Sequence, residues 1–260
     1  MSCNAEMLRT SDLIAGEPKS TGYHQLAVVT GAARRVGSLI ALHLAAKGYA
    51  VVLHYHSSKL DAEKIAAEII QSGGQVHLVQ ADLTRPDEIV RMFSVIDALP
   101  GELKILVNSA ALMIPSDLAV LDVERWDKLM NLNTRAVWLC SREAAKRMPE
   151  RGFILNISDV GAGKNWTRYG GYVISKAAVE SLTKILARQF APRVRVCAVA
   201  PGLLMRAENQ PLEEWKKLAE KVPMKRTADT AELLAVLDFL VDNDYITGEV
   251  ISLSGGYHLV

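Results

Sequence analysis

Short runs of apolar residues alternate with longer stretches of mixed polarity from residue 25 to residue 260. The short runs are rich in valine, isoleucine and leucine, which is typical of strands buried on both faces of a parallel sheet. These predicted strands cover residues 26–30, 50–55, 76–81, 104–108, 153–158, 194–199 and 249–253. The longer stretches repeat apolar residues every three or four positions, as helices with one buried face do. These predicted helices cover residues 36–47, 60–71, 122–148, 172–190 and 231–241, and another begins at Pro86.

The regular alternation of strand and helix predicts an α/β fold made of βαβ units. We expect residues 25–260 to form one domain, a Rossmann-type doubly wound parallel sheet of about seven strands with helices on both faces. Residues 1–24 lack the basic segment followed by an apolar segment that marks a signal peptide, so we expect a flexible N-terminal arm.

Composition and charge argue against several classes of function. The net charge is +1 at pH 7, which gives no reason to expect a nucleic acid or a membrane as partner. No apolar run reaches the ~20 residues that a membrane-spanning helix needs. The three cysteines lie far apart, without metal-binding or redox spacing. We therefore expect reduced thiols, no metal site and a cytoplasmic protein.

The turn after the first predicted strand has the context of a dinucleotide-binding turn, because it joins a strand to a helix. It reads T-G-A-A-R-R-V-G, residues 30–37. Gly31 allows the tight turn and Gly37 a close approach of helix and strand, so that free N–H groups at the helix start, near Val36, can face a pyrophosphate. An ordinary tight turn is the alternative. Arg35 stands where a glycine is common.

The second predicted strand ends in L-H-Y-H-S-S-K, without the carboxylate that holds the ribose hydroxyls in an NAD-specific site. The residues of this end, with Arg35, would form a cationic pocket rich in hydrogen-bond donors; they are Tyr55, His56, Ser57 and Ser58. Such a pocket suits the 2′-phosphate of NADP, which a carboxylate would repel. The sequence thus predicts NADPH as the cofactor.

Two later strand ends fit the same ligand. Asp82, followed by Leu83, could accept a hydrogen bond from the adenine amino group. Asn108, Ser109 and Ala110 close the fourth predicted strand where the cofactor would pass. Each of these polar residues alone is more often a structural cap.

The helix after the fifth predicted strand opens with Y-V-I-S-K, which places Tyr172 and Lys176 four residues apart on one helix face. A lysine ammonium stabilises a tyrosinate and lowers the phenol pKa from its ordinary value near ~10. We expect this tyrosine to exchange a proton with the substrate while a hydride moves.

The order of these motifs resembles the short-chain dehydrogenases/reductases. The resemblance extends from about residue 25 to the C-terminus, through T-G-x-x-x-x-x-G, A-D-L, V-N-S-A-A, N-L-N-T, Y-x-x-x-K, A-P-G and S-G-G-Y. It implies that Tyr172 is the general acid and that Lys176 orients the ribose. It also implies that Asn133 holds a water linked to Lys176, and that Pro201 and Gly202 pass beside the nicotinamide.

The family usually has a serine 13 residues before the catalytic tyrosine, and this chain has Asp159 there. Either the loop shifts so that Ser158, beside the cofactor, serves in its place, or an acid has replaced the serine. The second pattern, with the arginine in the glycine turn, resembles the pteridine reductase and dihydromonapterin reductase branch. That likeness implies reduction of a dihydropterin, with proton delivery by Tyr172 and Asp159. The sequence leaves open whether Asp159 is protonated or stays ionised.

The expected substrate site contains Ala111, Met113 and Leu203 beside Asp159 and Tyr172. Pteridine reductases place an aromatic ring near the position of Met113, where this chain offers a softer apolar face. Trp166 could supply an aromatic ring, or it could serve in packing or in a lid.

Two other functions remain open: a carbonyl reductase of the same family, acting on a 3-oxoacyl, sugar or xenobiotic ketone, and a sensor that binds NADPH without chemistry. The resemblance also implies a homotetramer, packed through the predicted helices 122–148 and 172–190, and the apolar residues 257–260 would suit another contact. The core of the protein explains the apolar helix faces equally well.

Overall fold

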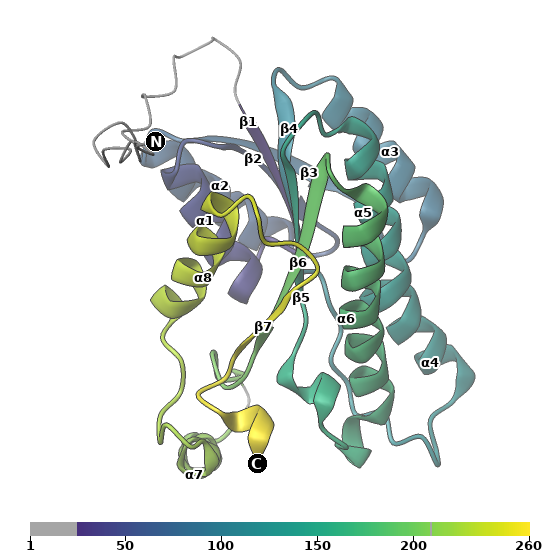
Figure 1. The fold of residues 1–260 in the computed structure, drawn as a ribbon, viewed down its shortest axis with the longest axis vertical. Coiled ribbons are helices and arrows are strands. Elements are labelled where there is room, and N and C mark those ends of the chain that lie inside the picture. Colours follow the sequence, from purple (N-terminus) through teal and green to yellow (C-terminus); the bar gives the residue numbers. More distant parts are fainter. Residues whose placement is uncertain (1–24, 209) are drawn as a thin grey trace, which may run out of the picture.

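The computed structural model describes residues 25–208 and 210–260, so the predicted N-terminal arm lies outside the described residues. Seven parallel strands form one sheet in the order β3-β2-β1-β4-β5-β6-β7 (Figure 1). They are β1 (Gln25–Thr30), β2 (Ala50–Tyr55), β3 (Gln75–Gln80), β4 (Glu102–Asn108), β5 (Gly152–Ile157), β6 (Val194–Pro201) and β7 (Val250–Leu253). Each predicted strand is confirmed, with ends that differ by no more than two residues.

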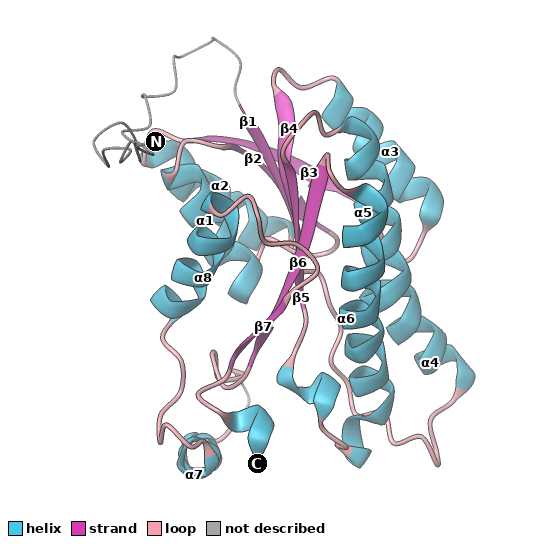
Figure 2. Ribbon diagram, viewed as in Figure 1, coloured by secondary structure: helices cyan, strands magenta, loops and turns pink. Residues whose placement is uncertain are grey.

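Helices cover both faces of the sheet, with α1, α2 and α8 on one side and α3 to α6 on the other (Figure 2). The helices are α1 (Arg35–Ala46), α2 (Lys59–Gln71), α3 (Pro86–Asp97), α4 (Val123–Met130), α5 (Ala136–Arg147), α6 (Gly170–Phe190), α7 (Leu212–Lys221) and α8 (Thr230–Asp242). Short helical turns are η1 (Asn131–Arg135), η2 (Val160–Gly163), η3 (Thr167–Tyr169) and η4 (Tyr257–Leu259). The predicted doubly wound α/β fold is confirmed.

The central strands contribute to two cores, because successive side chains point to opposite faces of a sheet. Val28 packs into the core under α3, α5 and α6, whereas Ala27 and Val29 pack into the core under α1 and α8. This arrangement explains why the strands read as unbroken apolar runs. No helix of the described residues is both long enough and apolar enough to cross a membrane.

The predicted helix 122–148 is interrupted. Its middle five residues, Asn131–Arg135, form a π-helical turn in which the Ala136 N–H bonds to the Asn131 carbonyl. This turn divides the helix into α4 and α5. Helix α7 was not expected from the sequence; its few apolar residues follow helical spacing, but none of its residues is buried.

The strand order fixes where a ligand can bind. The chain winds outward from β1 to β3, then returns to β4 on the other side of β1. In open α/β sheets such a reversal leaves a crevice beyond the carboxyl ends of the two central strands.

Candidate active site

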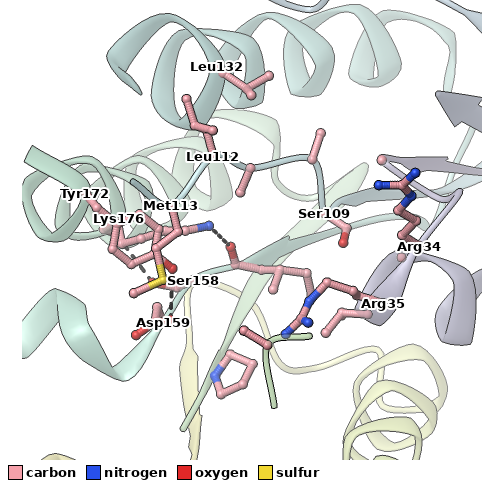
Figure 3. A pocket seen from close by; sticks show the side chains of 18 of the residues that line it. Arg34, Arg35, Ser109, Leu112, Met113, Leu132, Ser158, Asp159, Tyr172 and Lys176 are labelled. Atoms are coloured by element: carbon pink, nitrogen blue, oxygen red, sulfur yellow. Dashed lines mark hydrogen bonds between the residues drawn. The ribbon is translucent and has the colours of Figure 1, made fainter. Parts of the chain in front are cut away.

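A cavity of about 1530 Å³ lies at this crevice, and we call it the central cavity. Pockets for a single small ligand usually span ~300–1,000 Å³, so this one has room for a dinucleotide and a substrate together. Figure 3 shows Arg34 and Arg35 at one end and Asp159, Tyr172 and Lys176 at the other. All predicted site residues line it except Asn108 and Asn133.

At the two glycines of the turn the backbone is packed too closely for a side chain. A Cβ on Gly31, which has a φ of 63°, would lie 2.8 Å from Ala110 Cα, and a Cβ on Gly37 would lie 2.3 Å from the Gly31 carbonyl oxygen. The Thr30 hydroxyl oxygen accepts hydrogen bonds from the N–H groups of Ser109 and Ala110, at 3.0 and 3.1 Å. The turn and the end of β4 therefore form one backbone surface, and this surface fits a cofactor that must approach the main chain closely.

His54 supports this turn and was missed by the sequence reasoning. Its Nδ1 accepts a hydrogen bond from the Gly31 N–H at 3.1 Å, so Nε2 carries the proton and donates to the Ala81 carbonyl at 3.0 Å. Burial lowers the pKa of His54 to about 4, which keeps the ring neutral near pH 7. The available signal was a lone histidine at the end of an otherwise apolar strand.

Arg35 adopts a φ of 52°, a left-handed conformation that favours glycine. Its guanidinium donates to the carbonyl oxygens of Met205 at 2.9 Å and Arg206 at 3.3 Å, on the far wall of the cavity. Arg34 bonds to Asp61 at 2.5 Å instead. Tyr55, His56, Ser57 and Ser58 line the same end of the cavity. The basic, donor-rich end that the sequence predicted is therefore assembled, with Arg35 extended along it.

Asp82 is a structural cap as well as a lining residue. Its Oδ1 accepts hydrogen bonds from the Thr84 N–H at 2.9 Å and the Thr84 hydroxyl at 2.7 Å. Burial acts to raise the pKa of Asp82, but these hydrogen bonds outweigh it and leave the pKa below its ordinary value. Leu83 lines the cavity beside it, and the contact with adenine stays a prediction.

The side chain of Asn108 does not face the cofactor site, which corrects the sequence prediction. Its amide donates to Ser141 Oγ at 3.0 Å and to Asn156 Oδ1 at 2.9 Å, within the buried layer between the sheet and α5. The strand places Asn108 on the interior face, whereas its neighbours Ser109 and Ala110 line the cavity.

The carboxylate of Asp159 faces the phenol of Tyr172. The Tyr172 hydroxyl donates to Asp159 Oδ2 at 2.9 Å, and the Gly161 N–H donates to Asp159 Oδ1 at 2.6 Å. Lys176, one helical turn after Tyr172, donates from Nζ to the Ile157 carbonyl at 2.7 Å. Its Nζ lies 5.9 Å from the centre of the Tyr172 ring. The carboxylate, phenol and ammonium thus converge at one end of the cavity.

The protonation of this group differs from the sequence expectation. Burial, together with the adjacent Asp159 carboxylate, raises the pKa of Tyr172, so the expected lowering by Lys176 is wrong for this structure. Burial also raises the pKa of Asp159, although the hydrogen bonds from Gly161 and Tyr172 act in the opposite direction. Burial lowers the pKa of Lys176 to about 8, against the influence of Asp159. Burial is the largest cause of the raised pKa of Tyr172, and the directly bonded Asp159 carboxylate adds to it.

Ser158 does not replace the missing serine. Its hydroxyl donates to Glu180 Oε1 at 2.9 Å on helix α6. The side chain is buried, so the alternative in which Ser158 helps Tyr172 is not supported by its position.

Asn133 uses its carboxamide to hold a loop. Its Oδ1 accepts from the Leu112 N–H at 2.8 Å, and its Nδ2 donates to the Leu112 carbonyl at 2.8 Å and to Ser175 Oγ at 3.0 Å. The side chain therefore positions the cavity segment that includes Met113, and the water link to Lys176 stays a prediction.

The remaining predicted residues line the cavity: Ala111, Met113, Val36, Pro201, Gly202 and Leu203. Trp166 also lines it, and so do two aromatic residues that the sequence reasoning did not assign to the site, Trp215 on α7 and Tyr257 in η4. Their positions depend on segments distant in sequence, which no local pattern reveals.

Comparisons with known proteins agree with this geometry. The chain matches the family described as enoyl-(acyl carrier protein) reductase over residues 31–258. It is 32% identical over 255 residues to an NADPH-dependent aldehyde reductase-like chloroplastic protein of Arabidopsis thaliana, covering 90% of this chain and 94% of the relative. It is 32% identical over 240 residues to the 3-oxoacyl-[acyl-carrier-protein] reductase FabG of Staphylococcus epidermidis, covering 90% and 98%.

Among solved structures, FolM alternative dihydrofolate reductase 1 from Brucella canis, complexed with NADP, superposes with a TM-score of 0.86. That protein is 32% identical to this chain, and the match covers 91% of this chain and 94% of the other. A short-chain dehydrogenase/reductase of Serratia marcescens superposes with a TM-score of 0.85 at 29% identity, covering 90% and 98%.

Proposed function

The chain belongs to the short-chain dehydrogenase/reductase family and is an oxidoreductase that uses NADPH, and on that premise we propose that it reduces a dihydropteridine. The observation that carries this proposal is the hydrogen bond from Tyr172 to Asp159 at the end of the central cavity. The dihydrofolate reductase named FolM, which is 32% identical, supports the same substrate class.

The cavity residues fit NADPH along its whole length. The turn from Gly31 to Gly37 offers main-chain contact, and the basic end around Arg35 suits a 2′-phosphate. A non-glycine residue at positive φ costs about 1–2 kcal/mol, so an arginine kept there points to a function for its charge. NADPH bound in this cavity supplies the hydride.

The chain's own residues supply the proton. A pterin ring gains a proton on a ring nitrogen when the neighbouring carbon gains hydride. The phenol of Tyr172 already points its proton at Asp159, and burial brings the Asp159 carboxyl closer to protonation. The pair holds an exchangeable proton at a buried phenol on the cavity wall. Lys176, held by the Ile157 carbonyl, places a positive charge beneath the pair.

A carbonyl reductase is the second candidate, since curated relatives are named as aldehyde and 3-oxoacyl reductases. A ketone oxygen usually receives a second hydrogen bond from a serine beside the tyrosine. Here the Ser158 hydroxyl is bonded to Glu180, and an acid occupies the expected position. This arrangement favours a ring nitrogen over a ketone oxygen.

The direct test is NADPH oxidation with dihydrobiopterin, dihydromonapterin and dihydrofolate, beside an aldehyde and a 3-oxoacyl thioester. Turnover of none of the three pteridines would reject the pteridine proposal. Asp159→Ser separates the two candidates, because pteridine reduction should collapse whereas ketone reduction should change little. Asp87→Ser, at an exposed acid of α3 outside the cavity lining, serves as the control.

Tyr172→Phe distinguishes an enzyme from a cofactor sensor. An enzyme should still bind NADPH but lose turnover with every substrate. A sensor should show no turnover before the substitution either. Assembly into a homotetramer and a cytoplasmic location stay predictions; gel filtration with light scattering tests the first.

A further inference from the structure

We propose that Trp166 and Tyr257 form an aromatic wall on which a flat bicyclic ring lies beside Asp159. This inference rests on the proposed function and names the residues that would select the ring. Both side chains line the central cavity and come from segments about 90 residues apart. Met113, half exposed in the loop held by Asn133, offers only a flexible thioether face.

Trp166 is packed directly against the segment that carries Asp159. A Cβ built on Gly161 would lie 2.7 Å from Trp166 Cζ3 and 2.9 Å from Asp159 Oδ1. Only a glycine therefore fits between the indole and the carboxylate. The Trp166 carbonyl also accepts the Tyr169 N–H at 2.9 Å, at the start of the turn that leads to Tyr172. The indole thus packs against the segment that carries Asp159, and the main chain of Trp166 is bonded to the turn that precedes Tyr172.

Tyr257 is held by contacts around the last helical turn, η4. The Lys164 ammonium lies 4.0 Å from the centre of the Tyr257 ring and also bonds to the Val260 carbonyl. Lys164 belongs to the loop between Asp159 and Trp166, so this contact joins η4 to that loop. Cation–π contacts of this kind hold an aromatic ring in a fixed orientation.

The backbone before Tyr257 is fixed as well. Gly256 has a φ of 85°, and a Cβ there would lie 2.9 Å from Pro223 Cγ. Ser254 Oγ and His258 Nδ1 are 2.7 Å apart, which closes the turn on itself. Burial raises the pKa of the Tyr257 phenol and the Asp159 carboxylate adds to this effect, consistent with the two groups lying near each other.

A preformed aromatic surface favours planar conjugated ligands, because every such ring has a π face to stack. Stacking of a conjugated base on one aromatic side chain is commonly worth about tenfold or more in affinity. Removal of either ring should therefore weaken flat ligands and leave aliphatic ones unaffected. The proton-handling residues are unchanged in such variants, so turnover at saturation should fall little.

The experiment uses the full chain with Trp166→Leu, Tyr257→Leu and the conservative variants Trp166→Phe and Tyr257→Phe. Trp138→Leu and Tyr245→Leu, outside the cavity lining, are the matched controls. Calorimetry with the NADP⁺-loaded protein gives the Kd of dihydrobiopterin without turnover. The KM values of 2-naphthaldehyde and hexanal, with NADPH, compare a flat ring with an aliphatic chain.

We expect each leucine variant to weaken dihydrobiopterin and 2-naphthaldehyde about tenfold, with hexanal unchanged and the phenylalanine variants close to wild type. Leucine variants within twofold of wild type for both rings would overturn the wall, as would equal losses in the phenylalanine and leucine variants. If the wild type binds no dihydrobiopterin but the leucine variants still have a raised KM for 2-naphthaldehyde, the aromatic wall is supported and the pteridine proposal is rejected. If the wild type prefers neither ring to hexanal, the aromatic wall and the pteridine proposal are both rejected.

Discussion

Replacing Lys176 with methionine should change how the stability of the protein depends on pH. Lys176 is 4% exposed, and burial lowers its pKa from 10.5 to about 8. The difference between these values corresponds to about 3 kcal/mol, at ~1.4 kcal/mol for each pKa unit. This is the cost of keeping a charged lysine in the folded protein below about pH 8.

The direction of the effect follows from proton binding. Below about pH 8 the lysine is protonated in the folded and the unfolded chain, and the full cost is present. Between about pH 8 and 10.5 the unfolded chain binds a proton that the folded chain does not. The free energy of unfolding contributed by this group therefore rises with pH across that window. Methionine has no such proton, so Lys176→Met should lack this rise.

The measurement is urea unfolding of wild type and Lys176→Met at several values from pH 7 to 10. The wild type should gain on the variant by about 1.4 kcal/mol for each pH unit above 8, approaching about 3 kcal/mol in total. At pH 7 two effects on the free energy of unfolding oppose each other in the variant. Removal of the buried charge stabilises it, whereas loss of the hydrogen bond to the Ile157 carbonyl destabilises it by about 1–3 kcal/mol, so we expect similar stabilities at that pH. Turnover should be lost throughout.

Lys184→Met is the matched control, because Lys184 is exposed on the same helix α6. Its difference from wild type should stay constant from pH 7 to 10. Unfolding free energies of wild type and Lys176→Met that run parallel over that range would refute the buried-charge argument.

Three further substitutions test other parts of the site. Asp159→Asn keeps an acceptor for the Tyr172 hydroxyl but removes the exchangeable proton, so pteridine turnover should fall about 10²–10⁴-fold with NADPH affinity unchanged; a fall under threefold would contradict the proton role. Arg35→Gly should relieve the positive φ yet reduce kcat/KM for NADPH about 10–100-fold relative to NADH, since a charge-assisted contact is lost; an unchanged ratio would place the arginine outside cofactor selection. His54 is neutral with a pKa of about 4, so the stability of the wild type should drop as the pH falls from 6.5 towards 4. His54→Gln should lack that part of the drop when urea unfolding is compared at pH 7 and pH 5. Equal drops in the two proteins would argue against a buried neutral histidine.

Strands and helices could be predicted because burial on both faces of the sheet leaves a direct pattern in the chain. The same pattern does not say which face a residue at a strand end will use. Asn108 and Ser109 are neighbours, yet only Ser109 lines the cavity, since successive side chains of a strand alternate. Helix α7 was missed although its apolar residues follow helical spacing; the segment is short and polar on average, and none of its residues is buried.

The identity of the acid beside Tyr172 could be predicted by counting 13 residues back, and its position confirms that geometry. The resulting pKa of Tyr172 could not be predicted, because it depends first on how deeply the phenol is buried and then on the adjacent carboxylate. Asp159 bonds to the phenol at 2.9 Å, whereas the Lys176 ammonium is 5.9 Å from the centre of the ring. The meeting of Trp166 and Tyr257 depends on the whole fold, so a local motif could not reveal it.

The π-helical turn Asn131–Arg135 sets the rotation of α4 relative to α5 about their helix axis. An α-helix advances about 100° for each residue, so deleting one residue there would rotate α4 against α5 by about that angle. The face of α4 that borders the cavity and the face of α5 that packs on the sheet could then no longer both keep their positions. A change of length at this turn should therefore be tolerated far less than a substitution on either side of it. Exposed positions of α4 can vary in sequence without disturbing the core, provided that the length of the turn is preserved.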